Sequence, residues 1–215
     1  QIEKKILDLC VNKSLMPRQH FIKMFSDNEM NLDWIDSEIA AKKPYGEPLA
    51  KYRQAIVEQQ EKLRTLYDAA RKVGRELLVE IIAGKHGPLD DHTIERALTE
   101  LYDLGIRPDW WKLEPQVSTA AWRNIEAVIN QRDAWCRGVV LLGLEAPQNE
   151  LEAAFKAVAD IDVVKGFAIG RTIFAEAAEQ WLAGRTTDKE AIDDMANRFE
   201  RLVQAWSRAR AAKAA

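Results

Sequence analysis

From about residue 48 onward, the spacing of apolar residues switches repeatedly between a helical period and short continuous runs. Segments with apolar residues three and four positions apart predict helices, and apolar runs of four to eight residues between turn residues predict buried strands. The predicted helices are 49–73, 93–104, a helix that opens at Ser118 or Thr119, 150–159, 173–182 and 188–211. The predicted strands are 76–82, 109–114, 138–144 and 163–169.

This alternation of strands and helices is typical of an α/β fold with a parallel sheet. Glycines at 74, 105 and 184 mark the expected ends of three helices. Asp90 or Asp91 is the expected N-cap of helix 93–104. Residues 1–47 show amphipathic helical spacing but no strand, so we interpret them as a separate helical N-terminal segment. The sequence therefore predicts two parts, residues 1–47 and residues 48–215.

Composition narrows the class of protein. With 215 residues, 47% of them hydrophobic and 30% charged, the chain has the make-up of one ordinary globular domain. The net charge of −3 and the absence of long runs of like charge give no reason to expect a nucleic-acid partner. The apolar runs are too short to cross a bilayer, so we expect no membrane partner and a soluble, cytoplasmic protein.

One predicted strand carries a lysine among apolar residues. Side chains two apart in a strand share a face, so Trp110, Lys112 and Glu114 are expected on one side of strand 109–114. Lysine is rarely buried without a partner, and partial desolvation between tryptophans favours the neutral amine that attacks a carbonyl. Lys112 is thus a candidate Schiff-base lysine. The alternative is a structural ion pair of Lys112 with Glu114 or another neighbour.

Strand 76–82 contains a second ionisable side chain, Glu80. Consecutive strands of a parallel sheet are usually neighbours, so Glu80 and Lys112 are expected within reach of each other. A carboxylate beside an amine can orient it and move protons during imine formation. A buried salt bridge without catalytic function remains the alternative.

The last predicted strand ends in Gly170 and Arg171. A glycine allows close approach of backbone N–H groups to a ligand, and a guanidinium suits a phosphate. Taken alone, the pair is explained better by an ordinary turn, but the loops after the last strands of α/β barrels commonly bind phosphate. His86, Asp90, Asp91 and His92 could be written as metal ligands, but loop polarity and helix capping explain them better. Cys10 and Cys136 lack metal-site spacing, so we expect free thiols and no metal.

Four runs of the sequence resemble a known family. They are Gly105–Pro115, Gly74–Ile82, Arg137–Leu144 and Lys165–Phe174. They are similar to the domain fused C-terminally to bacterial 5-dehydro-2-deoxygluconokinase, a sugar kinase of inositol catabolism. That domain resembles class I aldolases of the tagatose-bisphosphate type, which are TIM barrels. The resemblance covers about Tyr52 to Ala211.

This resemblance implies a TIM (β/α)8-barrel fold, of which residues 48–215 form the second half with about four β/α units. It implies a class I aldolase in which Lys112 forms the Schiff base and Glu80 is the catalytic carboxylate. Gly170 and Arg171 match phosphate contacts, and Glu114 and Gly143 complete the expected substrate or phosphate site. No cofactor is implied.

The inositol pathway suggests 5-dehydro-2-deoxygluconate 6-phosphate as the substrate, cleaved to dihydroxyacetone phosphate and malonic semialdehyde. The expected partners are a small-molecule sugar phosphate, a fused or associated carbohydrate kinase domain, and further copies of the chain in a homo-oligomer. The earlier aldolase strand that carries another active-site lysine has no counterpart in residues 1–47, so this segment is left unassigned, with a remnant of the first half of the barrel as the alternative. A non-catalytic sugar-phosphate-binding or assembly domain of a carbohydrate kinase is therefore the alternative function.

Overall fold

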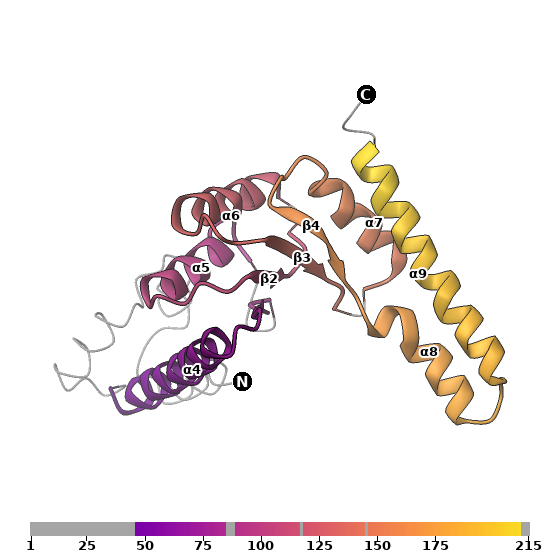
Figure 1. Cartoon of the computed structure of the whole chain (residues 1–215), viewed down its shortest axis with the longest axis horizontal. Coiled ribbons are helices and arrows are strands. Elements are labelled where there is room, and N and C mark those ends of the chain that lie inside the picture. The colour runs from indigo at the N-terminus through magenta and orange to yellow at the C-terminus, as the bar shows by residue number, and fades with distance from the viewer. Residues whose placement is uncertain (1–45, 85–88, 117, 145, 212–215) are drawn as a thin grey trace, which may run out of the picture. The chain divides into compact units, whose positions relative to one another are not determined.

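The computed structural model describes residues 46–84, 89–116, 118–144 and 146–211 (Figure 1). The predicted N-terminal segment 1–47 lies outside these residues, apart from its last two positions. Those two begin helix α4 (Gly46–Lys72), in agreement with the predicted helix 49–73. The chain divides into two compact units, residues 1–68 and 69–215, and the division falls inside α4. The second unit contains the whole sheet and all the predicted site residues.

Strands and helices alternate through this unit in the predicted order. The strands are β1 (Leu78–Ile81), β2 (Trp110–Leu113), β3 (Gly138–Leu142) and β4 (Val164–Ala168). The helices are α5 (Thr93–Asp103), α6 (Thr119–Arg132), α7 (Gln148–Ala157), α8 (Arg171–Leu182) and α9 (Asp188–Ala211). Each predicted strand and helix is confirmed, with bounds that differ by one to three residues where they differ.

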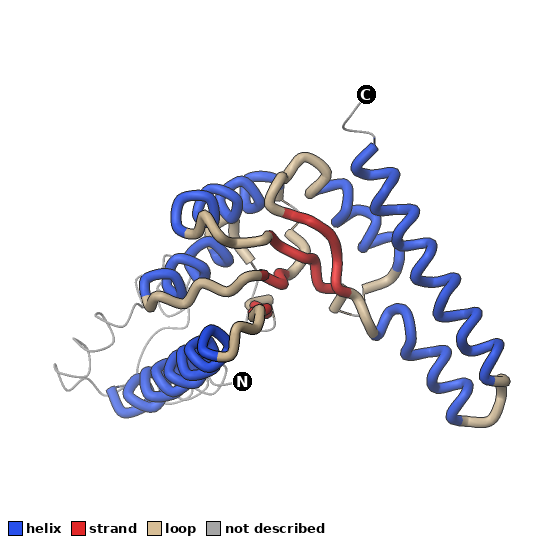
Figure 2. The backbone as a smooth tube through the Cα atoms, in the orientation of Figure 1, coloured by secondary structure: helices blue, strands red, loops and turns tan. Residues whose placement is uncertain are grey.

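The strands form a four-stranded parallel sheet in the order β1-β2-β3-β4 (Figure 2). Each strand pairs with the next strand in the sequence. The pairs are parallel because the helix between two strands returns the chain to the amino ends of the strands. The register places Glu80 opposite Lys112, Lys112 opposite Val140, and Val140 opposite Gly166. This alternation of parallel strands and helices is consistent with a partial β/α barrel.

The two faces of the sheet differ in burial. One face carries most of the buried apolar strand residues, which are Val79, Trp111, Leu113, Val139, Leu141 and Val164, while the buried Leu142 alternates onto the other face. Tyr102 of α5 contacts Trp111, and Phe155 of α7 stacks on Phe167 of β4, so these helices cover this face. The other face carries Glu80, Lys112 and the exposed Leu78. We call it the open face.

The C-terminal helix α9 packs against α7 and α8. Its Trp206 contacts both Phe155 and Phe167, which extends the core past β4. The Arg210 guanidinium donates hydrogen bonds to the carbonyl groups of Ala159 at 2.8 Å and Val164 at 2.6 Å. These bonds attach the end of α9 to the last strand.

Glycines end three helices as predicted. Gly74, Gly105 and Gly184 have φ angles of 64°, 74° and 68°, a left-handed conformation that costs little only without a Cβ atom. None of the described helices is long and apolar enough to cross a membrane.

Candidate functional site at the carboxyl end of the sheet

Glu80 and Lys112 form an ion pair on the open face. Lys112 Nζ lies 2.8 Å from Glu80 Oε1, and the two side chains are 40% exposed for Glu80 and 26% exposed for Lys112. The pairing follows from the register, because residues opposite each other in adjacent strands project on the same side. The predicted proximity of the two residues is confirmed. The arrangement holds an amine next to a proton acceptor at a place that solvent reaches.

Glu114, two residues after Lys112, is buried and does not pair with it. Its carboxylate accepts the backbone N–H groups of Ala83 at 2.5 Å and Gly84 at 2.9 Å, both in the segment that follows β1. The alternative ion pair of Lys112 with Glu114 is therefore wrong, because the Glu114 oxygens bind the backbone of the neighbouring loop. Sequence reasoning missed this contact.

Asp109 makes a similar contact at the opposite end of the same strands. Its Oδ2 accepts the backbone N–H of Leu77 at 2.9 Å, just before β1, and its Oδ1 lies 3.3 Å from an Arg71 guanidinium nitrogen. Two carboxylates that flank β2 thus hold both ends of β1. The acidic residues at both ends of this apolar strand were the only sequence signal for these contacts. Their partners are backbone N–H groups, which a sequence does not distinguish from one another.

The other predicted ligand contacts follow β3 and β4. Gly143 is buried, and a Cβ atom there would lie 3.0 Å from Ile169 Cγ2, so the glycine permits close packing of the two strand ends. Gly170 is the N-cap of α8, and Arg171 is the first residue of that helix and is exposed. The predicted helix began at Ile173, and the earlier start puts Arg171 at the positive end of the helix dipole. These residues share the carboxyl edge of the sheet with Glu114.

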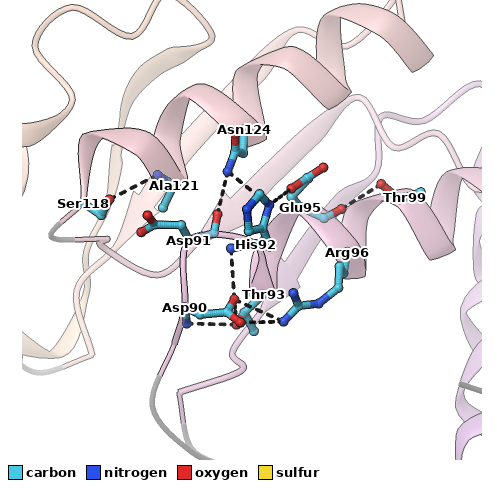
Figure 3. Close-up of polar contacts among 10 residues, drawn as sticks. All are labelled: Asp90, Asp91, His92, Thr93, Glu95, Arg96, Thr99, Ser118, Ala121 and Asn124. Carbon is cyan, nitrogen blue, oxygen red and sulfur yellow. Dashed lines mark hydrogen bonds and ion pairs between the residues drawn. The ribbon is translucent and has the colours of Figure 1, made fainter. Parts of the chain in front are cut away.

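A polar cluster surrounds the start of α5 (Figure 3). The N-cap is His92, and its side chain makes no cap hydrogen bond, so the prediction of Asp90 or Asp91 as the N-cap is wrong. Asp90 instead accepts hydrogen bonds from the His92 N–H, the Thr93 hydroxyl and the Arg96 guanidinium. Burial by itself raises the pKa of Asp90, but these donors outweigh it and lower the pKa to about 2.

The cluster joins α5 to α6. His92 Nδ1 lies 2.5 Å from Glu95 Oε2, and Asn124 of α6 donates to the Asp91 carbonyl at 3.0 Å (Figure 3). Among the described residues, no group of three or more His, Cys, Asp or Glu side chains is arranged to hold a metal ion. His86 lies outside the described residues. The described cluster therefore stabilises the start of α5 and connects α5 to α6.

Cys136 is a free thiol before β3, and burial raises its pKa to about 11. We expect iodoacetamide to alkylate it slowly at pH 8 in the native protein and rapidly in urea, measured by mass spectrometry in a Cys10→Ala background. Because the folded pKa lies above the unfolded value, the thiol's contribution to stability is complete below about pH 9 and is lost as the pH rises towards 11. Rapid native alkylation at pH 8 would contradict the raised pKa.

A family model described as an uncharacterized protein conserved in bacteria (DUF2090) matches residues 32–210. The chain belongs to this family. The matched residues of this DUF2090 protein include the whole sheet and all six predicted site residues, which are Glu80, Lys112, Glu114, Gly143, Gly170 and Arg171.

The comparisons also return a partial match to a curated protein. Over 81 residues, the DUF2090 chain is 35% identical to the RNA polymerase sigma factor RpoD of Neisseria gonorrhoeae. The match covers 38% of this chain and 12% of the sigma factor, so the chain spans a small part of that protein's length. No solved structure matches the DUF2090 chain.

Proposed function

We propose that residues 48–215 are a class I aldolase-like domain that cleaves a ketose phosphate through a Schiff base on Lys112. The observation that carries the proposal is the Lys112–Glu80 pair, an amine and a carboxylate 2.8 Å apart on the open face of a parallel sheet. The proposed substrate is 5-dehydro-2-deoxygluconate 6-phosphate, and the products are dihydroxyacetone phosphate and malonic semialdehyde. The substrate comes from the family resemblance of the four sequence runs.

The surroundings of Lys112 leave room for a ligand. The row of opposite residues runs from Glu80 through Lys112 and Val140 to Gly166. A Cβ atom at Gly166 would meet nothing within 4 Å, so the space above this end of the row is open. Apart from Glu80 and Lys112, this row carries no charged side chain. An amine beside an apolar residue and a glycine is accessible to a carbonyl compound, which supports the proposed attack.

The proposed reaction uses the two side chains as nucleophile and proton carrier. The Lys112 ammonium first loses a proton to solvent, and the free amine adds to the ketone. Protonation and loss of the hydroxyl as water give a protonated imine that withdraws electrons from the neighbouring carbon–carbon bond. Glu80 is placed to take the proton of the hydroxyl two carbons from the ketone, so that this bond breaks and the aldehyde product leaves. Proton return and addition of water then release the second product and restore the amine.

Gly170 and Arg171 are the proposed phosphate contacts. They follow β4, two strands from β2, which corresponds to roughly 10 Å at the usual strand spacing. Backbone N–H groups at the start of α8 and the Arg171 guanidinium are suited to a phosphate, since both carry positive charge. A ketose phosphate, with the long Lys112 and Arg171 side chains reaching towards it from either side, is the proposed ligand of this span.

The proposal extends to the wider expectations stated for this chain. They are a TIM-barrel type of fold of which residues 48–215 form the second half, a fused or associated carbohydrate kinase domain and self-association; a cytoplasmic location is proposed beside them from the short apolar runs. Each is separable from the chemistry at Lys112, because the Schiff base depends only on the amine and its neighbours.

Borohydride reduction tests the Schiff base directly. With the full chain and dihydroxyacetone phosphate, we expect a reduced covalent adduct that peptide mass mapping assigns to Lys112. The exposed Lys165 of β4 is the internal control and should stay unmodified, because it pairs with the Asp162 carbonyl rather than with a carboxylate. Absence of an adduct would reject the proposal. Thermal stabilisation by sugar phosphates with neither adduct nor cleavage would favour the alternative, a non-catalytic binding domain.

A further inference from the structure

Glu114 is 3% exposed although it carries a carboxylate. Its Oε2 accepts the N–H groups of Ala83 and Gly84, and its Oε1 accepts Gly84 again at 3.2 Å. A buried charge is stable only where such donors replace lost water, and hydrogen bonds to a charged group are about twice as strong as neutral ones. These oxygens are therefore committed to the backbone after β1. We call this set of contacts the Glu114 clasp.

Gly84 is the residue that lets the clasp form. A Cβ atom at this position would lie 2.6 Å from Glu114 Oε1, which is closer than carbon and oxygen can approach. Any other residue at position 84 would force Glu114 Oε1 to move away from this loop. The clasp thus depends on two residues 30 positions apart in the sequence.

The clasp lies at the carboxyl ends of the two strands that carry the reactive pair. Glu80 and Lys112 are opposite each other in β1 and β2. Glu114 follows Lys112 by two residues, and Ala83 follows Glu80 by three. The hydrogen bonds of the clasp therefore tie the two strand ends together just beyond the ladder that places Glu80 opposite Lys112.

We propose that Glu114 is a positioning residue, which holds the Glu80 carboxylate against the Lys112 amine through the backbone of Ala83 and Gly84. This inference rests on the proposed function for the reactive pair, and it replaces the substrate contact that the resemblance implies for Glu114. Glu114 touches no substrate atom in this role. Displacement of a catalytic group by about 1 Å lowers the rate by about 10²-fold, which sets the expected size of the effect.

Asp109 offers a matched control. Like Glu114, it flanks β2 and accepts a backbone N–H of the chain beside β1, but it does so at the amino ends of the strands. Asp109→Asn therefore replaces a charged acceptor with a weaker, neutral amide oxygen at the same pair of strands, as Glu114→Gln does, but away from Lys112. A general loss of strand attachment would affect both variants alike.

The first test is steady-state kinetics of the full chain with the ketose phosphate. We expect Glu114→Gln to lower kcat by about 10²-fold, to shift the pH profile of kcat and to leave KM unchanged, while Asp109→Asn lowers the melting temperature but keeps kcat. A raised KM with unchanged kcat would make Glu114 a substrate contact and overturn the proposal. Equal losses of kcat in both variants would also overturn it.

A second test does not depend on catalysis. Reductive methylation by formaldehyde, followed by mass spectrometry, reports how available the Lys112 amine is without substrate. We expect faster methylation of Lys112 in Glu114→Gln than in wild type or Asp109→Asn, because Glu80 no longer stays beside it. Unchanged methylation would reject the clasp even if wild type proves inactive, whereas an inactive wild type with faster methylation rejects only the aldolase function.

Gly84→Ala covers the case in which Glu114→Gln fails to fold. Its Cβ atom would displace Glu114 Oε1 from the loop after β1. We therefore expect a loss of kcat and a faster methylation of Lys112, as in Glu114→Gln. The double variant Gly84→Ala/Glu114→Gln should lose little more than the more damaged single variant, because both substitutions weaken the same clasp. Additive losses would show that the two residues act separately and would overturn the inference.

Discussion

Replacement of Lys112 by alanine is expected to abolish the reduced imine adduct and to lower the rate of ketose phosphate cleavage by at least about 10³-fold. The reason is that no second amine stands opposite Glu80 in the register of the described sheet. Stability should change little. Both side chains of the pair are partly exposed, and such ion pairs contribute about 0–1 kcal/mol. Trapping experiments, cleavage assays and thermal melts on the same preparation measure all three effects.

Lys112→Arg is the control that separates charge from nucleophile. A guanidinium keeps the positive charge next to Glu80 but stays protonated at any ordinary pH, so it cannot form an imine. We expect this variant to fold with the ion pair in place and to be as inactive as Lys112→Ala. Cleavage or trapping that survives in Lys112→Arg would mean that another group is the nucleophile.

Glu80→Gln probes the other half of the pair. The variant keeps the Lys112 amine but removes the proton acceptor, so imine trapping should persist while cleavage falls by about 10²- to 10⁴-fold. An adduct that forms without turnover would assign Glu80 to the bond-breaking step rather than to imine formation.

The order and faces of the strands were predictable because they follow from local patterns. The alternation around Lys112 separates Trp111 and Leu113 from Lys112 itself, and the structure buries the first two on one face. Sequential pairing of parallel strands then brings Glu80 opposite Lys112. Periodicity and connection rules were sufficient for this part of the site.

The surroundings of Glu114 could not be predicted in the same way. Alternation placed Glu114 with Lys112, but the strand ends at Leu113 and the carboxylate bonds to N–H groups of Ala83 and Gly84. Every residue except proline carries such a donor, so no sequence pattern marks which donors a buried carboxylate will find. The same reason explains why Asp90 contacts the start of α5 without being its N-cap.

Trp111→Ala is expected to cost about 3–5 kcal/mol of unfolding free energy, a large part of the roughly 5–15 kcal/mol typical of a domain. Trp111 is fully buried, its ring meets Tyr102 edge-on at 5.6 Å, and its Nε1 donates to the Tyr102 hydroxyl at 2.8 Å. Urea unfolding followed by circular dichroism measures the loss. Trp135→Ala is the matched control, because that indole is 87% exposed and its removal should change stability by less than about 0.5 kcal/mol.

Tyr102→Phe isolates the hydrogen bond within this contact. It keeps the ring packing but leaves the buried Trp111 N–H without its acceptor, at an expected cost of about 1–3 kcal/mol. A cost near zero would show that the ring contact alone stabilises the pair.

The Trp111 contact also bears on the site, because it decides which way β2 faces. A shift of one residue in the register of a strand moves every side chain to the opposite face. The buried indole of Trp111 makes such a shift costly, so Lys112 must face the open side with Glu80. Trp111→Phe should therefore keep Lys112 trapping at temperatures where the variant is folded. Lost trapping in a folded Trp111→Phe variant would show that packing of β2 alone does not hold Lys112 in place.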